Sequence, residues 1–124
     1  MARAAVPAVS AFAKTVGYSR AVRDGRHVYM SGTAPVGLES EDPYEQAKRC
    51  LEIILEALHE LGAGPEHVVR TRIFIVDAAD WEAIGRAHGE VFGSIQPATS
   101  MLVIRGLLDP AWKVEIEADA LLPE

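Results

Sequence analysis

Residues 96–121, QPATSMLVIRGLLDPAWKVEIEADAL, decide the fold of this chain because they predict two strands joined by a turn. From Val114 to Ala118 (VEIEA), apolar and acidic residues alternate, which is the pattern of a strand with one buried face. Glu115 and Glu117 therefore share the opposite face of that strand. Carboxylates in line on a strand form either a solvated surface or the floor of a site, and the sequence leaves both interpretations open.

The size and charge of the chain bound its class. At 124 residues and 13.4 kDa it has the length of one domain, which we place at residues 1–124. A net charge of -6 opposes attraction to phosphate backbones, so we expect no nucleic-acid partner. The single cysteine, Cys50, cannot form an internal disulfide, which fits a cytoplasmic location. Because no apolar run approaches the roughly 20 residues of a membrane span, we also expect no membrane association.

Turn and cap residues divide the first half of the chain. Residues 1–18 are expected to be extended and partly irregular, and Asp24-Gly25 predicts a hairpin between residues 19–23 and 27–31. Asp42 as N-cap, followed by Pro43, begins a helix that ends near Gly62. The apolar residues of this helix recur at helical spacing and predict its buried stripe: Tyr44, Ala47, Leu51, Ile54, Leu55, Leu58 and Leu61.

The second half predicts a strand at residues 68–76, a helix at about 80–92, and strands at about 99–105 and 112–121. This order predicts an α+β fold in which two helices cover one face of a mixed sheet. Gly85 and Gly89, four residues apart in the helix, predict a close approach to the sheet. Apolar side chains on the other sheet face would mark a contact surface between copies of the chain. That face is expected to carry Phe74, Met101 and Val103 beside Arg70 and Arg72, with Val69, Ile73 and Ile75 on the covered side.

Four blocks of sequence occur in a characteristic order. They are Gly17-Tyr18-Ser19 with Ala21-Val22, residues 28–32 (VYMSG), residues 68–71 (VVRT) before Phe74 and Asp77, and the segment from Pro97 to Glu115. Together they resemble the signature of the reactive-intermediate deaminase (Rid/YjgF, endoribonuclease L-PSP-like) family, over about residues 17–121. Four matches in register make this resemblance specific.

The resemblance implies a chorismate-mutase-like (YjgF-like) α+β sandwich that assembles as a homotrimer, with ligand clefts between adjacent subunits. Active members of the family hydrolyse reactive enamines and imines to ketones and ammonia, without a metal or an organic cofactor. By the same resemblance, Tyr18 and Ser31 line the cleft, and Glu115 positions and activates the attacking water. The alternative for Glu115 is a structural acid that bonds backbone at a subunit contact.

Thr99 departs from the family pattern. The family's deaminases carry an arginine at this position, and its bidentate fork grips a substrate carboxylate in a way that threonine cannot copy. Gly85 also stands in place of an asparagine, His88 in place of an aromatic residue, and Met101 where cysteine is common. The resemblance therefore implies a subgroup that keeps the water-handling end of the cleft, lacks the carboxylate clamp, and deaminates 2-imino acids inefficiently.

Three further residues have two interpretations each. Arg72 is either a displaced substrate anchor or a member of an ion pair at a trimer interface, with Glu115 or Glu117, and arginine suits both roles. Arg105 is either an anchor or an exposed residue at a strand end. His88, whose ordinary pKa lies near 6.5, is either an acid–base group or an interface histidine.

Three functions remain as hypotheses. The leading one is a metal-free hydrolase of small enamines or imines, with Glu115 as its catalytic residue and a small-molecule ligand in each inter-subunit cleft. Its candidate substrate-binding residues are Tyr18, Ser31, Thr99, Met101, Arg72 and His88. The second is a non-catalytic small-ligand binding protein that uses the same cleft. The third, a ribonuclease or translation inhibitor, is disfavoured by the acidic charge.

Overall fold

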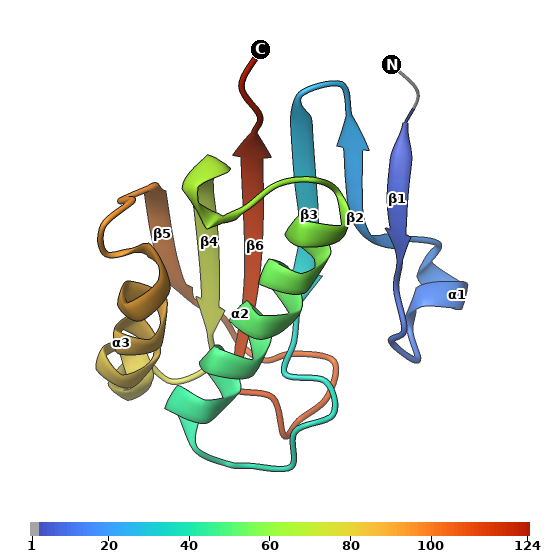
Figure 1. Cartoon of the computed structure of the whole chain (residues 1–124). Helices are drawn as coiled ribbons and strands as arrows, with labels where there is room; N and C mark the ends of the chain where they lie inside the picture. The colour runs from blue at the N-terminus through green and yellow to red at the C-terminus, as the bar shows by residue number, and fades with distance from the viewer. Residues whose placement is uncertain (1–2) are drawn as a thin grey trace.

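The computed structural model describes residues 3–124 and shows a six-stranded sheet with two helices packed side by side on one of its faces (Figure 1). The strands are β1 (Ala4–Pro7), β2 (Ser19–Asp24), β3 (His27–Thr33), β4 (Val68–Ile75), β5 (Ala98–Val103) and β6 (Val114–Leu121). The helices are α1 (Ala13–Val16), α2 (Pro43–Glu60) and α3 (Trp81–Phe92), with 3₁₀ turns at Pro65–His67 and Ala78–Asp80. The predicted α+β class and the sheet covered by two helices are confirmed.

The sheet order is β1-β2-β3-β6-β4-β5. Neighbouring strands are antiparallel except β4 and β5, which run parallel, so the sheet is mixed. Strand β6 lies between β3 and β4 and thereby joins the two halves of the sheet. The expected β2–β3 hairpin turns at Gly25, whose φ of 63° lies in the left-handed region that glycine accepts most easily.

Helix α2 forms where its caps predict. The Asp42 side chain accepts a hydrogen bond from the Tyr44 backbone N–H at 3.0 Å, and Pro43 occupies the first helical position. The helix ends at Glu60 with Leu61 as its C-cap, and Gly62, the next residue, has a φ of 80°. The predicted apolar stripe packs on the sheet, and Cys50, expected to be partly buried, is fully buried in the same core.

Strand β6 sets the two faces of the sheet. Val114, Ile116, Ala118 and Ala120 are buried and point toward the helices, as the alternation predicts. Glu115, Glu117 and Asp119 lie on the opposite face, which no helix covers (Figure 1). We call this uncovered side the open face.

Several details differ from the sequence-based expectations. Residues 1–18 were expected to be extended and partly irregular, and residues 1–2 lie outside the described part of the chain. Within residues 3–18 the extended segment is the edge strand β1, whose pairing was not predicted, and the one-turn helix α1 was missed. Val69 is 50% exposed because the β4–β6 register shifts between Val68 and Arg70, which turns Val68 inward instead. An added Cβ at Gly89 would meet no atom within 4 Å, and at Gly85 it would only touch Met101 at 4.0 Å. The expected close approach of these two glycines to the sheet is therefore wrong.

The face assignment of β5 is also corrected. Met101 packs against the core on the helix side, close to Gly85. Leu102 pairs with Phe74 and is 43% exposed on the open face. The apolar patch predicted for this face therefore exists, but Leu102 contributes to it in place of Met101 and Val103. None of the helices within residues 3–124 combines the length and apolarity that a bilayer-spanning segment requires.

Candidate functional site

The Glu115 carboxylate lies on the open face directly over Gly32. A Cβ added at Gly32 would overlap Glu115 Oε1 and lie 3.0 Å from Cδ, so the carboxylate occupies the space that any other residue would fill. Burial raises the pKa of Glu115 above its ordinary value, the positive charge of Arg20 opposes that rise, and the charge of Glu117 adds to it. A half-buried carboxyl group of this kind exchanges protons nearer to neutral pH than an exposed one.

Arg20 is the basic group of this site, and no pattern in the sequence indicated its role. Two register shifts bring it there: Val6 pairs with Ala21 while Pro7 pairs with Ser19, and Met30 pairs with Ala118 while Thr33 pairs with Ile116. The second shift takes the Ser31 and Gly32 carbonyls out of the regular ladder. The Arg20 guanidinium donates to both carbonyl oxygens from one nitrogen, at 2.8 Å and 2.6 Å.

Arg20 is held in place at an energetic cost. The residue is only 8% exposed, and its Nε atom is buried without a hydrogen-bond partner among residues 3–124. An unpaired buried N–H group costs about 1–3 kcal/mol. Burial also lowers the pKa of Arg20, which the nearby Tyr18 and Glu115 oppose. Periodicity could not have found Arg20, because a bulge changes the face to which a side chain points.

Ser31 and Tyr18 lie on the Arg20 side of the site. The Ser31 hydroxyl donates to the Ser19 backbone oxygen at 2.7 Å, which fixes its orientation and leaves its lone pairs free to accept. Tyr18 immediately precedes β2 and lines a hollow of about 420 Å³ with residues of β1 and α1. The structure thus groups Arg20, Ser31 and Glu115 around the bulged end of β3, with Tyr18 close to Arg20.

Thr99 and His88 belong to a second polar group. Thr71 Oγ1 lies 2.7 Å from Thr99 Oγ1 and 2.9 Å from His88 Nε2, and the Thr99 hydroxyl is also 3.1 Å from the Pro97 carbonyl oxygen. Thr71 is fully buried on the helix side of β4. Burial lowers the pKa of His88, which favours the neutral ring. The Thr99 hydroxyl therefore serves a hydrogen-bonded chain between β4, β5 and α3.

The two groups do not meet within one chain. Thr71 and Thr99 bond on the helix side of the sheet, whereas Glu115 points to the open face. Strand β4 also separates β6 from β5. Of the predicted substrate-binding residues, Ser31 adjoins Gly32 beneath Glu115 and Tyr18 lies close to Arg20, while Thr99, Met101 and His88 lie at the β5–α3 edge.

The two candidate anchors have different surroundings. Arg72 Nη1 lies 3.2 Å from Glu117 Oε1 and 3.8 Å from Asp119 Oδ2, so Arg72 forms ion pairs with both carboxylates within the chain. Arg105 follows β5 in an exposed bend. Neither guanidinium stands beside Glu115 as a free carboxylate clamp.

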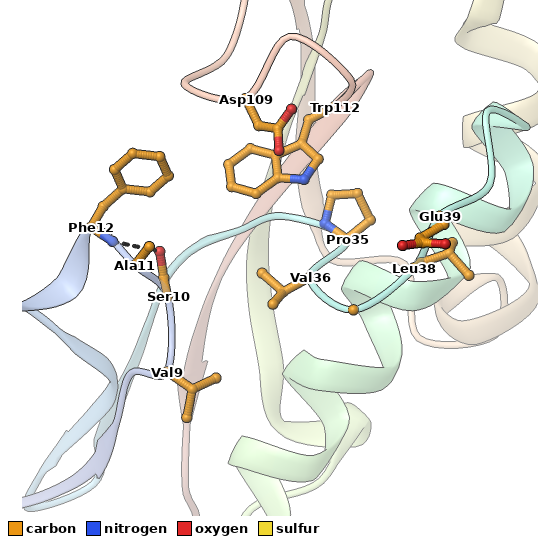
Figure 2. Close-up of a pocket in the computed structure, with 11 residues that line it drawn as sticks. Val9, Ser10, Ala11, Phe12, Pro35, Val36, Leu38, Glu39, Asp109 and Trp112 are labelled. Atoms are coloured by element: carbon orange, nitrogen blue, oxygen red, sulfur yellow. Dashed lines mark hydrogen bonds between the residues drawn. The ribbon is translucent and has the colours of Figure 1, made fainter.

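A separate hollow of about 690 Å³ opens between three loops at one end of the sheet (Figure 2). Its aromatic wall is Phe12 and Trp112, whose rings meet edge to face at 6.1 Å, and Asp109 and Glu39 supply carboxylates. None of the candidate site residues that the sequence predicted lines this hollow. Across residues 3–124, no three histidine, cysteine or carboxylate side chains gather closely enough to hold a metal ion.

Comparison with known proteins places this fold in a family. The model of the endoribonuclease L-PSP family matches residues 8–122, which is almost the whole chain. The chain belongs to this family. The membership inferred from the four sequence blocks is thereby confirmed.

Three of the proteins that are similar to this chain are described here. An uncharacterized protein of Streptomyces coelicolor is 39% identical over 115 residues, which cover 90% of this chain and 86% of that protein. A crystal structure of a YjgF/YER057c/UK114 family member from Mycobacterium tuberculosis is 41% identical, with a TM-score of 0.91 over 98% of this chain and 100% of that one. The 3-aminoacrylate deaminase RutC of Acinetobacter baylyi is 30% identical over 108 residues, covering 83% of this chain and 85% of that protein.

Proposed function

We propose that this protein hydrolyses small reactive enamines or imines to carbonyl compounds and ammonia, with Glu115 as the catalytic residue. The observation that carries the proposal is the Glu115 carboxylate, half-buried over Gly32 with a raised pKa. A relative named as a deaminase, 30% identical over most of both chains, supports the same reaction class. The name of the family model points to ribonuclease activity, but the net charge of -6 opposes RNA binding.

The reaction consumes one water, and both protons of that water pass to the substrate nitrogen through Glu115. An enamine first tautomerises to its imine. Water, held by the ionised Glu115 carboxylate, adds its oxygen to the C=N carbon and gives one proton to the carboxylate, which passes it to the imine nitrogen. The resulting neutral carbinolamine has C–O and C–N single bonds, and Glu115 is again ionised. The carboxylate then takes the hydroxyl proton and delivers it to the nitrogen as the C=O bond forms and the C–N bond breaks, so that ammonia leaves. A carboxyl group with a raised pKa suits both the accepting and the donating step.

We further propose that the cleft forms between copies of the chain in a homotrimer. Glu115 of one copy and the β5–α3 edge of a neighbour, which carries Thr99 and Met101, would face each other across it. This arrangement would explain why the two polar groups are apart in one chain. Phe74, Leu102 and Tyr29 leave an apolar surface on the open face, and such a surface on a monomer usually marks a contact.

The substrate is proposed to lack a carboxylate, or to have one bound by Arg105. Thr99 carries no charge, and its hydroxyl is bonded to Thr71 and Pro97. Arg72 is engaged by Glu117 and Asp119. With the clamp position occupied by threonine, a neutral imine would bind without leaving an uncompensated charge.

The same observation supports a second candidate function, which is non-catalytic binding of a small ligand in this cleft. In this case Thr99 would mark the loss of chemistry, and Glu115 would only orient the ligand. Ligands that raise the melting temperature without any turnover would favour this alternative over the hydrolase.

The test compares two variants of neighbouring glutamates on the open face. Ammonia and ketone release would be measured from imines generated in situ from a panel of neutral and acidic amino acids. Glu115→Gln should abolish release, because the amide cannot accept the proton from water. Glu117→Gln is the matched control, because it keeps the Glu115 carboxylate and removes a side chain that pairs with Arg72. It should retain release, with the acid limb of the pH profile moved to lower pH, since the Glu117 charge that raises the pKa of Glu115 is gone. Unchanged release in Glu115→Gln would end the hydrolase proposal.

A further inference from the structure

We propose that Arg20 is a positioning residue, which fixes the Ser31–Gly32 backbone beneath the Glu115 carboxylate and thereby sets where that carboxylate holds water. This inference rests on the proposed function of Glu115. It concerns a residue that does not touch the open cleft and that acts through two carbonyl groups.

The contacts form a continuous path. One terminal nitrogen of Arg20 donates to the Ser31 and Gly32 oxygens at 2.8 Å and 2.6 Å, at the point where the β3–β6 register shifts. The Ser31 oxygen also accepts from the Thr33 hydroxyl at 2.8 Å. Glu115 Oε1 lies against the Cα of that same Gly32. Any movement of the bulge would therefore move the surface on which the carboxylate rests.

The positive charge of Arg20 stabilises the ionised Glu115 carboxylate, while its hydrogen bonds hold the backbone beneath that carboxylate. Two charged groups change the pKa of Glu115: Arg20 from β2 lowers it and Glu117 from β6 raises it. Burial lowers the pKa of Arg20, and the charges of Tyr18, Glu115 and Cys50 oppose that change. A guanidinium remains protonated across the working pH range, so its charge constantly favours the ionised carboxylate that accepts a proton from water.

Arg23 provides a matched control on the same strand. Its guanidinium also bonds backbone carbonyls, donating from Nε to Gly25 at 2.9 Å and from Nη1 to Leu61 at 2.8 Å. These carbonyls lie at the hairpin and at the end of α2, away from Glu115. Loss of either arginine removes a guanidinium that bonds two carbonyl oxygens. Only loss of Arg20 should change the position and the pKa of the Glu115 carboxylate.

Three substitutions separate charge from hydrogen bonding. Arg20→Gln keeps an amide N–H₂ donor and removes the charge, Arg20→Met removes both, and Arg20→Lys keeps the charge. Because Arg20 borders a hollow of about 530 Å³ between β1 and α2, these side chains fit without overpacking. Arg23→Gln and Arg23→Met are made in parallel.

The first readout is the NMR titration of the Glu115 side-chain carboxyl carbon, which needs no activity. Arg20→Gln and Arg20→Met should move its midpoint to higher pH, Arg20→Lys should largely restore it, and the Arg23 variants should leave it unchanged. The second readout is the pH profile of imine hydrolysis. Its acid limb should move to higher pH in Arg20→Gln, and Arg20→Met should also lose on the order of ten- to a hundredfold in kcat.

The outcomes keep the two proposals distinct. If the protein shows no turnover at all, the hydrolase proposal fails while the Glu115 titration still tests Arg20. If Glu115→Gln abolishes activity but the Arg20 and Arg23 variants alter only the melting temperature, and to the same degree, Arg20 is a purely structural residue. An unmoved Glu115 titration in Arg20→Met overturns the proposal directly.

Discussion

Substitution of Gly32 by alanine should displace the Glu115 carboxylate while leaving the fold intact. The backbone at Gly32 has no positive φ, so alanine adopts it without strain. Its Cβ would overlap Glu115 Oε1 and stand 3.0 Å from Cδ. Because the obstacle is the end of a side chain, the carboxylate would retreat by roughly 1 Å rather than the strand, a misplacement that can reduce catalysis about 100-fold. This factor equals roughly 2.7 kcal/mol of transition-state free energy.

Steady-state kinetics of imine hydrolysis and urea unfolding would be measured for Gly32→Ala. We expect kcat/KM to fall by about two orders of magnitude, while the free energy of unfolding changes by less than about 1 kcal/mol. Gly106→Ala is the control, because a Cβ there meets no atom within 4 Å and the backbone is likewise free of positive φ. A crystal structure of Gly32→Ala that shows a displaced carboxylate alongside wild-type kcat/KM would refute the claim that this position matters.

Three further predictions concern buried polar groups. Thr71→Val should lower the free energy of unfolding by about 1–3 kcal/mol in urea titrations, because it leaves the His88 ring and the Thr99 hydroxyl without their shared partner; a change below 0.5 kcal/mol, roughly the worth of a surface substitution, would contradict this. Because burial raises the pKa of Glu115 in the folded state, its contribution to stability is fully present below the ordinary value of 4.5 and is lost as pH rises through the folded pKa. Glu115→Gln should remove that decline from a pH series of unfolding curves, and an unaltered pH dependence would count against a raised pKa. Burial strongly raises the pKa of Cys50, so thiol reagents should modify it only at the rate of global unfolding, and fast labelling of the native protein would contradict its burial.

Much of the fold could be predicted from local chemistry. Asp24-Gly25, Asp42 and Gly62 each specify a turn or a helix end through their own backbone or side-chain preferences, and each lies where it was expected. The alternation in β6 correctly separated Glu115 from the buried Val114 and Ile116. These features depend on near neighbours in sequence, which is why the sequence reveals them.

The missed features depend on pairing between distant strands. Strand β1 spans four residues and owes its place to pairing with β2 at the sheet edge. The register shifts that expose Val69 and place Arg20 near Glu115 leave no periodic pattern in the sequence. The candidate site was therefore predicted only in part: Glu115, Ser31 and Tyr18 came from the sequence, but the basic residue beside them did not.

The position of β6 between β3 and β4 has a consequence for how the chain folds. During synthesis, β1–β3 and β4–β5 can each pair as they emerge, but no strand joins these two halves of the sheet until residues 114–121 leave the ribosome. Completion of the sheet thus waits for contacts between segments more than 80 residues apart, as between Met30 and Ala118, and long-range closure of this kind slows folding. The same strand carries Glu115. A nascent chain, or one truncated before β6, therefore lacks the proposed catalytic carboxylate as well as the strand that completes the sheet.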